Sequence, residues 1–314
     1  MSQTEVYEKI SRLQRNIETV FIGKTEAVRL VLVGLFAGGH ILIEDMPGVG
    51  KTTLARALAR SIRSVFRRIQ FTPDLLPTDI VGVPIYNSND DRFVFKPGPI
   101  FANVVLADEI NRTTPRTQSS LLEAMNEFQV SVDGATHPLP KPFIVLATQN
   151  PHEYEGTFPL PESQLDRFLM RIQIGYPSRV DERRVLASQR LVHPLESLEP
   201  VLEGAEVEGI QLAVRQVRVD DSITDYILEI VSRSRHTEEL DIGVSPRGGL
   251  SLSRAAQALA LIEGRDYCLP DDVKRLAIPV LAHRVIRRAA LAAAGGRDER
   301  EIIREIVDAT AVPV

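Results

Sequence analysis

The sequence predicts an α/β fold in which a parallel sheet flanked by helices is followed by a domain built from helices. Up to Tyr176, short apolar runs suited to buried strands alternate with helical patterns, and this alternation is typical of a parallel sheet. Beyond Pro177, helical patterns follow one another and strand patterns are nearly absent. We therefore expect residues 1–177 to form an α/β core and residues 178–314 to form a helical domain.

The core begins with two predicted helices, over 7–20 and 25–36. The first places Ile10, Leu13 and Ile17 on one face at helical spacing, and the second is stopped by two glycines. Short apolar runs then predict five buried strands, at 40–43, 66–71, 103–107, 143–148 and 169–174. Helical spacing predicts further core helices beginning at 51 and over 118–127 and 164–168.

Two segments of the core are predicted to be hairpins or insertions. The long, proline-rich connection 72–100 alternates like short strands at 81–86 and 92–95, and a connection of this length is an ordered insertion or a functional loop. A second hairpin is predicted over 130–142, with Asp133 and Gly134 in its turn. The domain after Pro177 is predicted to contain helices at 182–190, 209–215, 222–235, 246–262, 270–287 and 299–307.

Composition argues against several classes of protein. Lys and Arg number 18 against 19 Asp and Glu up to Tyr176, and 19 against 23 beyond it, so nucleic acid is not an expected partner. No apolar run approaches the ~20 residues that a membrane helix needs, and the first 22 residues lack the pattern of a signal peptide. The single cysteine, Cys268, excludes an internal disulfide, and we expect a cytoplasmic protein without membrane contact.

The stretch 41–58 predicts a phosphate-binding loop between a strand and a helix. The loop residues are Pro47, Gly48, Val49 and Gly50, and the helix opens with Lys51, Thr52 and Thr53. Glycines let consecutive backbone N–H groups turn toward one centre, and the helix N-terminus adds the positive end of a dipole. Lys51 would supply charge to the outer phosphates and Thr52 a hydroxyl to Mg²⁺; Thr53 would pack or contact a phosphate.

This loop departs from the strict phosphate-loop pattern at one position. The pattern begins with glycine, and that position holds Asp45. Because the position lies where the strand ends, farthest from the outer phosphates, the loop can still bind phosphate with this change. The alternative is an ordinary glycine-rich turn from strand to helix.

Polar side chains end the next two buried strands. The strand 103–107 leads into Asp108 and Glu109, and the strand 143–148 leads to Asn150. Ligands bind at the carboxyl ends of parallel strands, so Asp108 would hold Mg²⁺ or its water shell. Glu109 would activate or orient the attacking water, and Asn150 would position that water or contact the γ-phosphate. The alternatives are a solvated strand end for the acids and a turn-forming Asn before Pro151.

With these motifs in order, the chain resembles the MoxR-type AAA+ ATPases, in the same broad clade as the magnesium chelatase small subunit. The motifs that carry the resemblance span nearly the whole chain, at 44–52, 70–77, 98–101, 108–112, 118–125, 147–151, 165–168 and 245–248. The resemblance implies a P-loop NTPase sheet in an AAA+ core, an all-helical lid, and ATP and Mg²⁺ as cofactors. It also implies that an aspartate at position 45 is normal usage.

The resemblance assigns roles to the predicted residues. Residues 48–53 would be the Walker A motif, Asp108 and Glu109 Walker B, and Asn150 sensor 1. Arg167 would be an arginine finger that reaches the nucleotide of a neighbouring subunit, and Arg247 would be sensor 2, reaching the γ-phosphate from the lid.

Further segments also take roles from the resemblance. Ile22 and Gly23, which follow Phe21, would lie near the adenine. Residues 76–97 would be the helix-2 insertion, and 130–141 the pre-sensor-1 hairpin.

The arginines leave alternatives open. Phosphoryl transfer gains from an arginine supplied in trans, but Arg167 could instead pair with Asp166 or stay on the surface. Arg247 could be an ordinary residue of a helix N-terminus, although cations are disfavoured there. Arg112 and Arg116 could face a subunit interface or a pore, and the sequence does not decide.

The predicted function is that of an ATP-hydrolysing motor that forms a homo-oligomeric ring, expected to be a hexamer, and remodels a client protein. The resemblance implies a partner with a von Willebrand factor A domain and roles in maturing or inserting metals into other enzymes. The alternatives are an ATP-gated interaction module with little turnover and a DNA-directed motor of the same clade. A small-molecule kinase is the least favoured.

Overall fold

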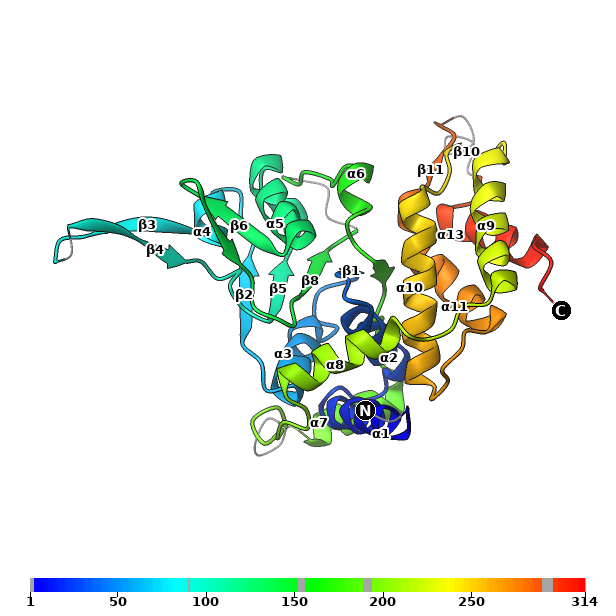
Figure 1. Ribbon diagram of the computed structural model, residues 1–314, viewed down its shortest axis with the longest axis horizontal. Coiled ribbons are helices and arrows are strands. Elements are labelled where there is room, and N and C mark those ends of the chain that lie inside the picture. The colour runs from blue at the N-terminus through cyan, green and yellow to red at the C-terminus, as the bar shows by residue number, and fades with distance from the viewer. Residues whose placement is uncertain (1–2, 90, 152–155, 189–193, 290–295, 314) are drawn as a thin grey trace.

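The computed structural model describes residues 3–89, 91–151, 156–188, 194–289 and 296–313. Its centre is a five-stranded parallel sheet (Figure 1). The strands lie in the order β2 (Phe66–Gln70), β5 (Val104–Asp108), β8 (Ile144–Gln149), β1 (Ile41–Glu44) and β9 (Met170–Ile172). Every neighbouring pair is parallel, which confirms the predicted sheet. The carboxyl ends of all five strands therefore meet at one edge, and the amino ends meet at the other.

Alternate residues of the central strands face the two sides of the sheet. Ile41 and Leu106 belong to one apolar cluster with residues of α1 (Gln3–Val20), α2 (Thr25–Ala37) and α3 (Lys51–Ser61). Leu42 and Val105 belong to a second cluster with residues of α4 (Pro77–Val81) and α5 (Pro115–Glu127). Successive side chains of a strand point to opposite faces, so both faces are covered by helices, as the unbroken apolar runs predict.

Two antiparallel hairpins extend from the core. The first pairs β3 (Gly82–Asn87) with β4 (Arg92–Pro97), and it projects from the side of the molecule opposite the C-terminal helices (Figure 1). The second pairs β6 (Gln129–Val132) with β7 (Ala135–Pro138). They occupy the two segments from which the sequence predicts short strands.

The remaining elements are mostly helices. They are η1 (Ile110–Arg112), α6 (Glu162–Leu165), α7 (Arg179–Ser188), α8 (Gly204–Val214), α9 (Asp221–His236), α10 (Pro246–Ile262), α11 (Pro270–Leu281), η2 (Ala282–Arg284) and α13 (Glu299–Ala309). The last two residues of the helix predicted at 182–190 lie outside the described residues. Within the described ranges, no helix is both long and apolar enough to cross a bilayer.

Two elements after Pro177 differ from the prediction. Helix α8 begins at Gly204 rather than 209, because the Glu206 carboxylate accepts a hydrogen bond of 2.8 Å from the Glu203 N–H and caps the earlier turn. The pattern at 270–287 is not one helix. Helix α11 ends at Leu281 and is followed by η2. The segment then forms the short strand β11 (Ile286–Arg287), which pairs with β10 (Leu240–Ile242).

The lid helices dock on the outer side of the sheet, beyond β9. Helix α10 packs against α2, and α11 packs against β9. The apolar cluster on the α1–α3 face continues without a break into residues of α10 and α11. Helix α8 also lies against α2, where the Gln211 side chain donates a hydrogen bond of 2.7 Å to the Leu35 carbonyl. Because α2 leads directly into the amino end of β1, this docking brings the start of α10 to the amino edge of the sheet.

Candidate active site

The loop after β1 forms a pocket of about 480 Å³ at the carboxyl edge of the sheet. Gly48 and Gly50 have φ angles of 85° and 94°, which side-chain-bearing residues rarely adopt. A Cβ atom at Gly50 would also lie 3.0 Å from the Phe21 ring. Predicted site residues that line the pocket are Pro47, Gly48, Gly50, Lys51, Thr52, Asp108, Glu109 and Asn150. The structure thus brings the ends of β1, β5 and β8 to one cavity.

Lys51 is the first residue of α3 and lies among three acids. Its ammonium donates a hydrogen bond of 2.5 Å to the Asp45 carbonyl. Partial burial lowers the pKa of Lys51, and the charges of Asp45, Asp108 and Glu109 oppose that change. The position therefore suits an ammonium that binds a strongly negative ligand.

Asp45, the departure from the phosphate-loop pattern, ties the loop to the end of β9. Its side chain is buried, and one carboxylate oxygen accepts hydrogen bonds of 2.6 Å from the N–H groups of both Ile174 and Gly175. The other oxygen accepts a bond of 2.9 Å from the Met46 N–H. Glycine at this position could make none of these bonds, so the aspartate is a structural part of the loop.

We expect Asp45→Gly, which would restore the strict pattern, to lower the free energy of unfolding by about 3 kcal/mol, because it leaves buried N–H groups without a charged acceptor. Urea denaturation without nucleotide measures this. Asp133→Gly is the matched control, since Asp133 lies exposed in a turn with φ of 49°, where glycine is at least as well suited. Equal stability of Asp45→Gly and the unmodified chain would contradict this role.

Asp108 is held on both of its carboxylate oxygens. Oδ1 accepts a hydrogen bond of 2.6 Å from the buried Thr148 hydroxyl. Oδ2 accepts bonds from Arg68, at 3.0 Å from Nε and 2.5 Å from Nη2. Thr148 also accepts the Glu109 N–H at 2.9 Å, so a single hydroxyl fixes both acidic residues relative to β8.

Glu109 has an unusual backbone and two side-chain contacts. Its φ and ψ of 58° and 50° are left-handed, a conformation that costs a residue with a side chain about 1–3 kcal/mol and that recurs at active sites. Oε2 accepts a hydrogen bond of 2.7 Å from Gln70 and lies 3.3 Å from Arg112 Nε. Arg112 lines the same pocket. These contacts fix the direction of the carboxylate.

The pocket offers oxygen ligands that fit Mg²⁺. Mg²⁺ binds carboxylate and hydroxyl oxygens, takes few protein ligands and keeps several waters. Thr52 and Asp108 line the cavity together, and the Asp108 carboxylate already accepts hydrogen bonds on both oxygens. A cation would therefore compete with Arg68 at Oδ2 or be held through water.

Several predicted binding residues lie beside this cavity rather than in its lining. Ile22 and Gly23 follow Phe21, whose ring lies next to Gly50, and Gly23 itself lies against the Asp181 carboxylate of α7. Val49 is buried. Thr53 lines a neighbouring cavity, which Thr52 also lines.

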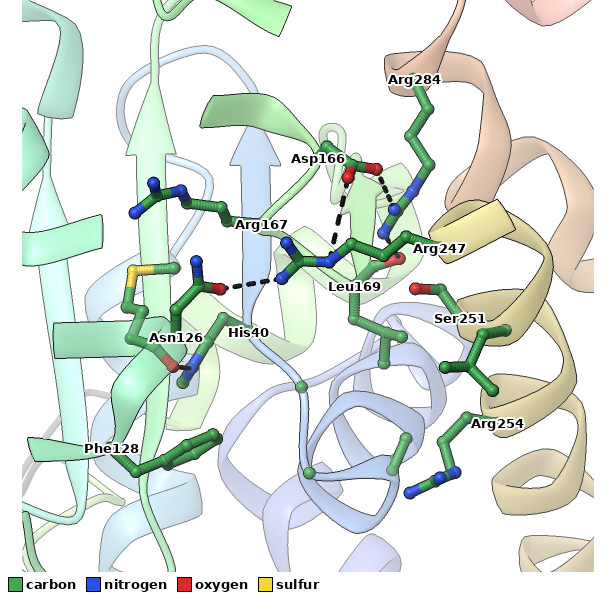
Figure 2. Close-up of a pocket in the computed structure, with 15 residues that line it drawn as sticks. His40, Asn126, Phe128, Asp166, Arg167, Leu169, Arg247, Ser251, Arg254 and Arg284 are labelled. Carbon is green, nitrogen blue, oxygen red and sulfur yellow. Dashed lines mark hydrogen bonds and ion pairs between the residues drawn. The ribbon is translucent and has the colours of Figure 1, made fainter. Parts of the chain in front are cut away.

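Arg167 and Arg247 lie in a different pocket, of about 250 Å³ (Figure 2). Arg167 comes just before β9, whose first residue pairs with the first residue of β1, so it lies at the amino edge of the sheet. Lys51 follows the opposite end of β1. Arg247 Nη2 donates a hydrogen bond of 2.8 Å to Asn126, and its Nε lies 3.8 Å from Asp166.

Arg247 lies away from the phosphate loop of its own chain, in a pocket that Lys51 does not line. The physical reason is the docking of the lid: α10 packs on α2, so its first turn faces the amino edge of the sheet. The structure brings Arg247 together with Arg167 instead. It also places Arg247 near Asp166, the partner that the sequence offered for Arg167.

The sequence reasoning missed three residues of the site, namely Arg68, Gln70 and Thr148. Gln70 and Thr148 lie near the carboxyl ends of predicted strands, which is the signal that singled out Asp108 and Asn150, whereas Arg68 lies in the middle of its strand. That signal could have found Thr148, a hydroxyl within a buried run. Arg68 and Gln70 lie on the edge strand β2, where exposed polar residues are ordinary.

Comparison with protein-family models finds two matches. Residues 40–170 match the ATPase family associated with various cellular activities (AAA), and residues 232–306 match the AAA lid domain. The first match contains the phosphate loop, the acid pair, Asn150 and Arg167. The second contains Arg247.

Similar proteins cover nearly the whole chain. The uncharacterised protein YeaC of Bacillus subtilis is 51% identical over 312 residues, which span 99% of this chain and 97% of the relative. Chaperone MoxR1 of Mycobacterium tuberculosis is 42% identical over 279 residues, spanning 86% of this chain and 74% of the relative. A crystal structure of a proposed ATPase from Cytophaga hutchinsonii superposes with a TM-score of 0.91 at 37% identity, covering 99% and 96% of the two chains.

Proposed function

Because the chain belongs to the MoxR-type AAA+ ATPases, we propose that it hydrolyses ATP to ADP and phosphate in the pocket of Lys51. The observation that carries this proposal is the convergence of Lys51, Thr52, Asp108, Glu109 and Asn150 on one cavity. A triphosphate there meets an ammonium, a helix N-terminus and glycine backbone, which are the groups that bind phosphate.

Each residue has a distinct task in this reaction. Lys51 binds the outer phosphates, and Thr52 and Asp108 would hold Mg²⁺, which when bound supplies positive charge to the phosphate oxygens. Glu109 accepts the proton of the attacking water while the bond from the γ-phosphorus to the β–γ bridging oxygen breaks. Asn150 orients that water or contacts the γ-phosphate. We place the adenine beside the turn of Phe21, Ile22 and Gly23.

Arg167 and Arg247 would complete the site of the next subunit. They lie together at the amino edge of the sheet, whereas the chain's own phosphate loop lies at the carboxyl edge. A contact between two different edges of identical chains is heterologous, and heterologous contacts form a ring when the rotation between subunits closes. We therefore propose a homo-oligomeric ring, a hexamer, in which each subunit donates both arginines to its neighbour.

The biological task we propose is chaperone-like remodelling of client proteins, including maturation or metal insertion. Support comes from the relative named Chaperone MoxR1. We also propose that the protein acts with a partner that has a von Willebrand factor A domain and that it is located in the cytoplasm. We divide the chain functionally at Pro177, with residues 1–177 as the nucleotide-binding core. Residues 178–314 then form the lid region, in which α7 and α8 connect the core to the lid helices.

Glu109→Gln tests the chemistry. We expect the variant to bind ATP as tightly as the unmodified chain and to lose about 10²- to 10⁴-fold in turnover, because the amide cannot accept the proton. Steady-state phosphate release and nucleotide titration measure the two quantities. Glu123→Gln is the control, since Glu123 is an exposed acid of α5. Turnover of Glu109→Gln within threefold of the control would refute the assigned role.

A further inference from the structure

The core segment that carries Arg167 is held by two residues of the lid. Arg284, in η2, donates a hydrogen bond to the Asp166 carboxylate and another of 2.6 Å to the Phe168 carbonyl. The neighbouring His283 ring lies 3.1 Å from the same carbonyl through Nε2. The lid therefore contacts the residues immediately before and after Arg167, although more than 100 residues separate the two segments in the sequence.

Arg284 requires Asp166 as its partner because Arg284 is buried. Its side chain is 1% exposed, whereas Asp166 is 24% exposed. Burial lowers the pKa of Arg284, and the charge of Asp166 opposes that change. A cation without access to water needs an anionic partner nearby, and among the described residues that line this pocket Asp166 is the only carboxylate. The pair thus fixes where residue 166 can lie.

Asp166 also faces the exposed arginine of α10. Its second oxygen lies 3.8 Å from Arg247 Nε, and Figure 2 shows the carboxylate between Arg247 and Arg284. Arg167 points away from Asp166 in the same view. The Asp166 carboxylate therefore lies between one buried arginine, Arg284, and one exposed arginine, Arg247.

We propose that Asp166 and Arg284 are positioning residues that hold Arg167 and Arg247 as one unit for the nucleotide of the adjacent subunit. This inference rests on the proposed trans site. Long arginine side chains on two different domains can meet one phosphate group only if the domains are fixed relative to each other, and small displacements of a catalytic group cost large factors in rate. While Arg284 keeps its hydrogen bonds to Asp166 and Phe168, a movement of the lid would carry the segment of Arg167 with it and displace both arginines together.

The test is Asp166→Asn, which keeps the size of the side chain and removes its charge. We expect the turnover number to fall up to ~100-fold, with the KM for ATP within about twofold of the unmodified chain, because the chain's own phosphate pocket is untouched. Arg284→Lys, which keeps the buried charge and loses the forked hydrogen bonds, is the second variant if Asp166→Asn does not fold. It is expected to show the same split between turnover and KM.

Asp272→Asn is the matched control. Asp272 is a buried lid carboxylate whose oxygens accept hydrogen bonds of 2.6 and 2.8 Å from Arg265, and neither residue lines the arginine pocket. The control loses a comparable ion pair and is expected to lower the thermal midpoint while turnover at 25 °C stays within twofold.

Mixed assemblies separate positioning from a general structural defect. Subunits of Lys51→Ala are expected to bind ATP poorly but donate intact arginines, so mixing them with Asp166→Asn subunits should restore turnover. The inference is overturned if Asp166→Asn has normal turnover, or if this mixture stays inactive while a mixture of Arg167→Ala and Lys51→Ala regains activity. Failure of both mixtures would overturn the shared site itself, and the positioning role with it.

Discussion

Replacing Arg167 by alanine is expected to lower ATP turnover about 10³- to 10⁵-fold, the range found for arginines supplied in trans to a transferring phosphoryl group. The affinity of the same subunit for ATP should not change, because Arg167 lies at the amino edge of the sheet and Lys51 follows the opposite end of β1. Steady-state phosphate release and equilibrium titration with nucleotide measure the two effects separately.

The control for this variant is Arg304→Ala, which removes an exposed arginine of α13. We expect it to leave both quantities unchanged. A loss of turnover smaller than tenfold in Arg167→Ala would show that Arg167 does not contact the transition state. A loss of ATP affinity without a loss of turnover would place Arg167 in the site of its own chain.

Replacing Lys51 by alanine is expected to weaken nucleotide binding strongly. The ammonium lies among the charges of Asp45, Asp108 and Glu109, and without it a triphosphate would face those acids alone. Truncating one partner of a buried charge pair costs about 2–5 kcal/mol of binding free energy, which corresponds to about 30- to 5,000-fold in affinity. Equilibrium titration measures the loss.

Lys96→Ala is the matched control for Lys51→Ala, since Lys96 is exposed on the β3–β4 hairpin. Its ATP affinity should equal that of the unmodified chain. Unchanged affinity in Lys51→Ala would remove the loop after β1 from the proposed site. Binding without turnover would instead assign Lys51 to the chemical step alone.

The parts of the site that follow strand ends could be predicted from the sequence. Short apolar runs identify the strands, and parallel strands all present their carboxyl ends at one edge. Lys51, Asp108 and Asn150 each come after such a run, so their convergence follows from topology without knowledge of packing. Helical spacing of apolar residues likewise identifies α10, whose N-terminal residues include Arg247.

The position of Arg247 in the folded chain could not be predicted in the same way. It depends on how α10 packs against α2, and that contact joins segments more than 200 residues apart. Asp45 illustrates a second limit. Its bonds to Ile174 and Gly175 explain the departure from the phosphate-loop pattern, but nothing local to Asp45 indicates them.

If one ATP site contains Lys51 of one subunit and Arg167 of the next, two inactive variants should regain activity when their subunits are mixed. Arg167→Ala subunits keep an intact phosphate pocket, and Lys51→Ala subunits keep an intact arginine. In a random equimolar ring, about one quarter of the sites combine the two intact halves. We expect phosphate release that approaches one quarter of the unmodified rate, whereas a mixture no more active than its separate components would show that the two residues do not share a site.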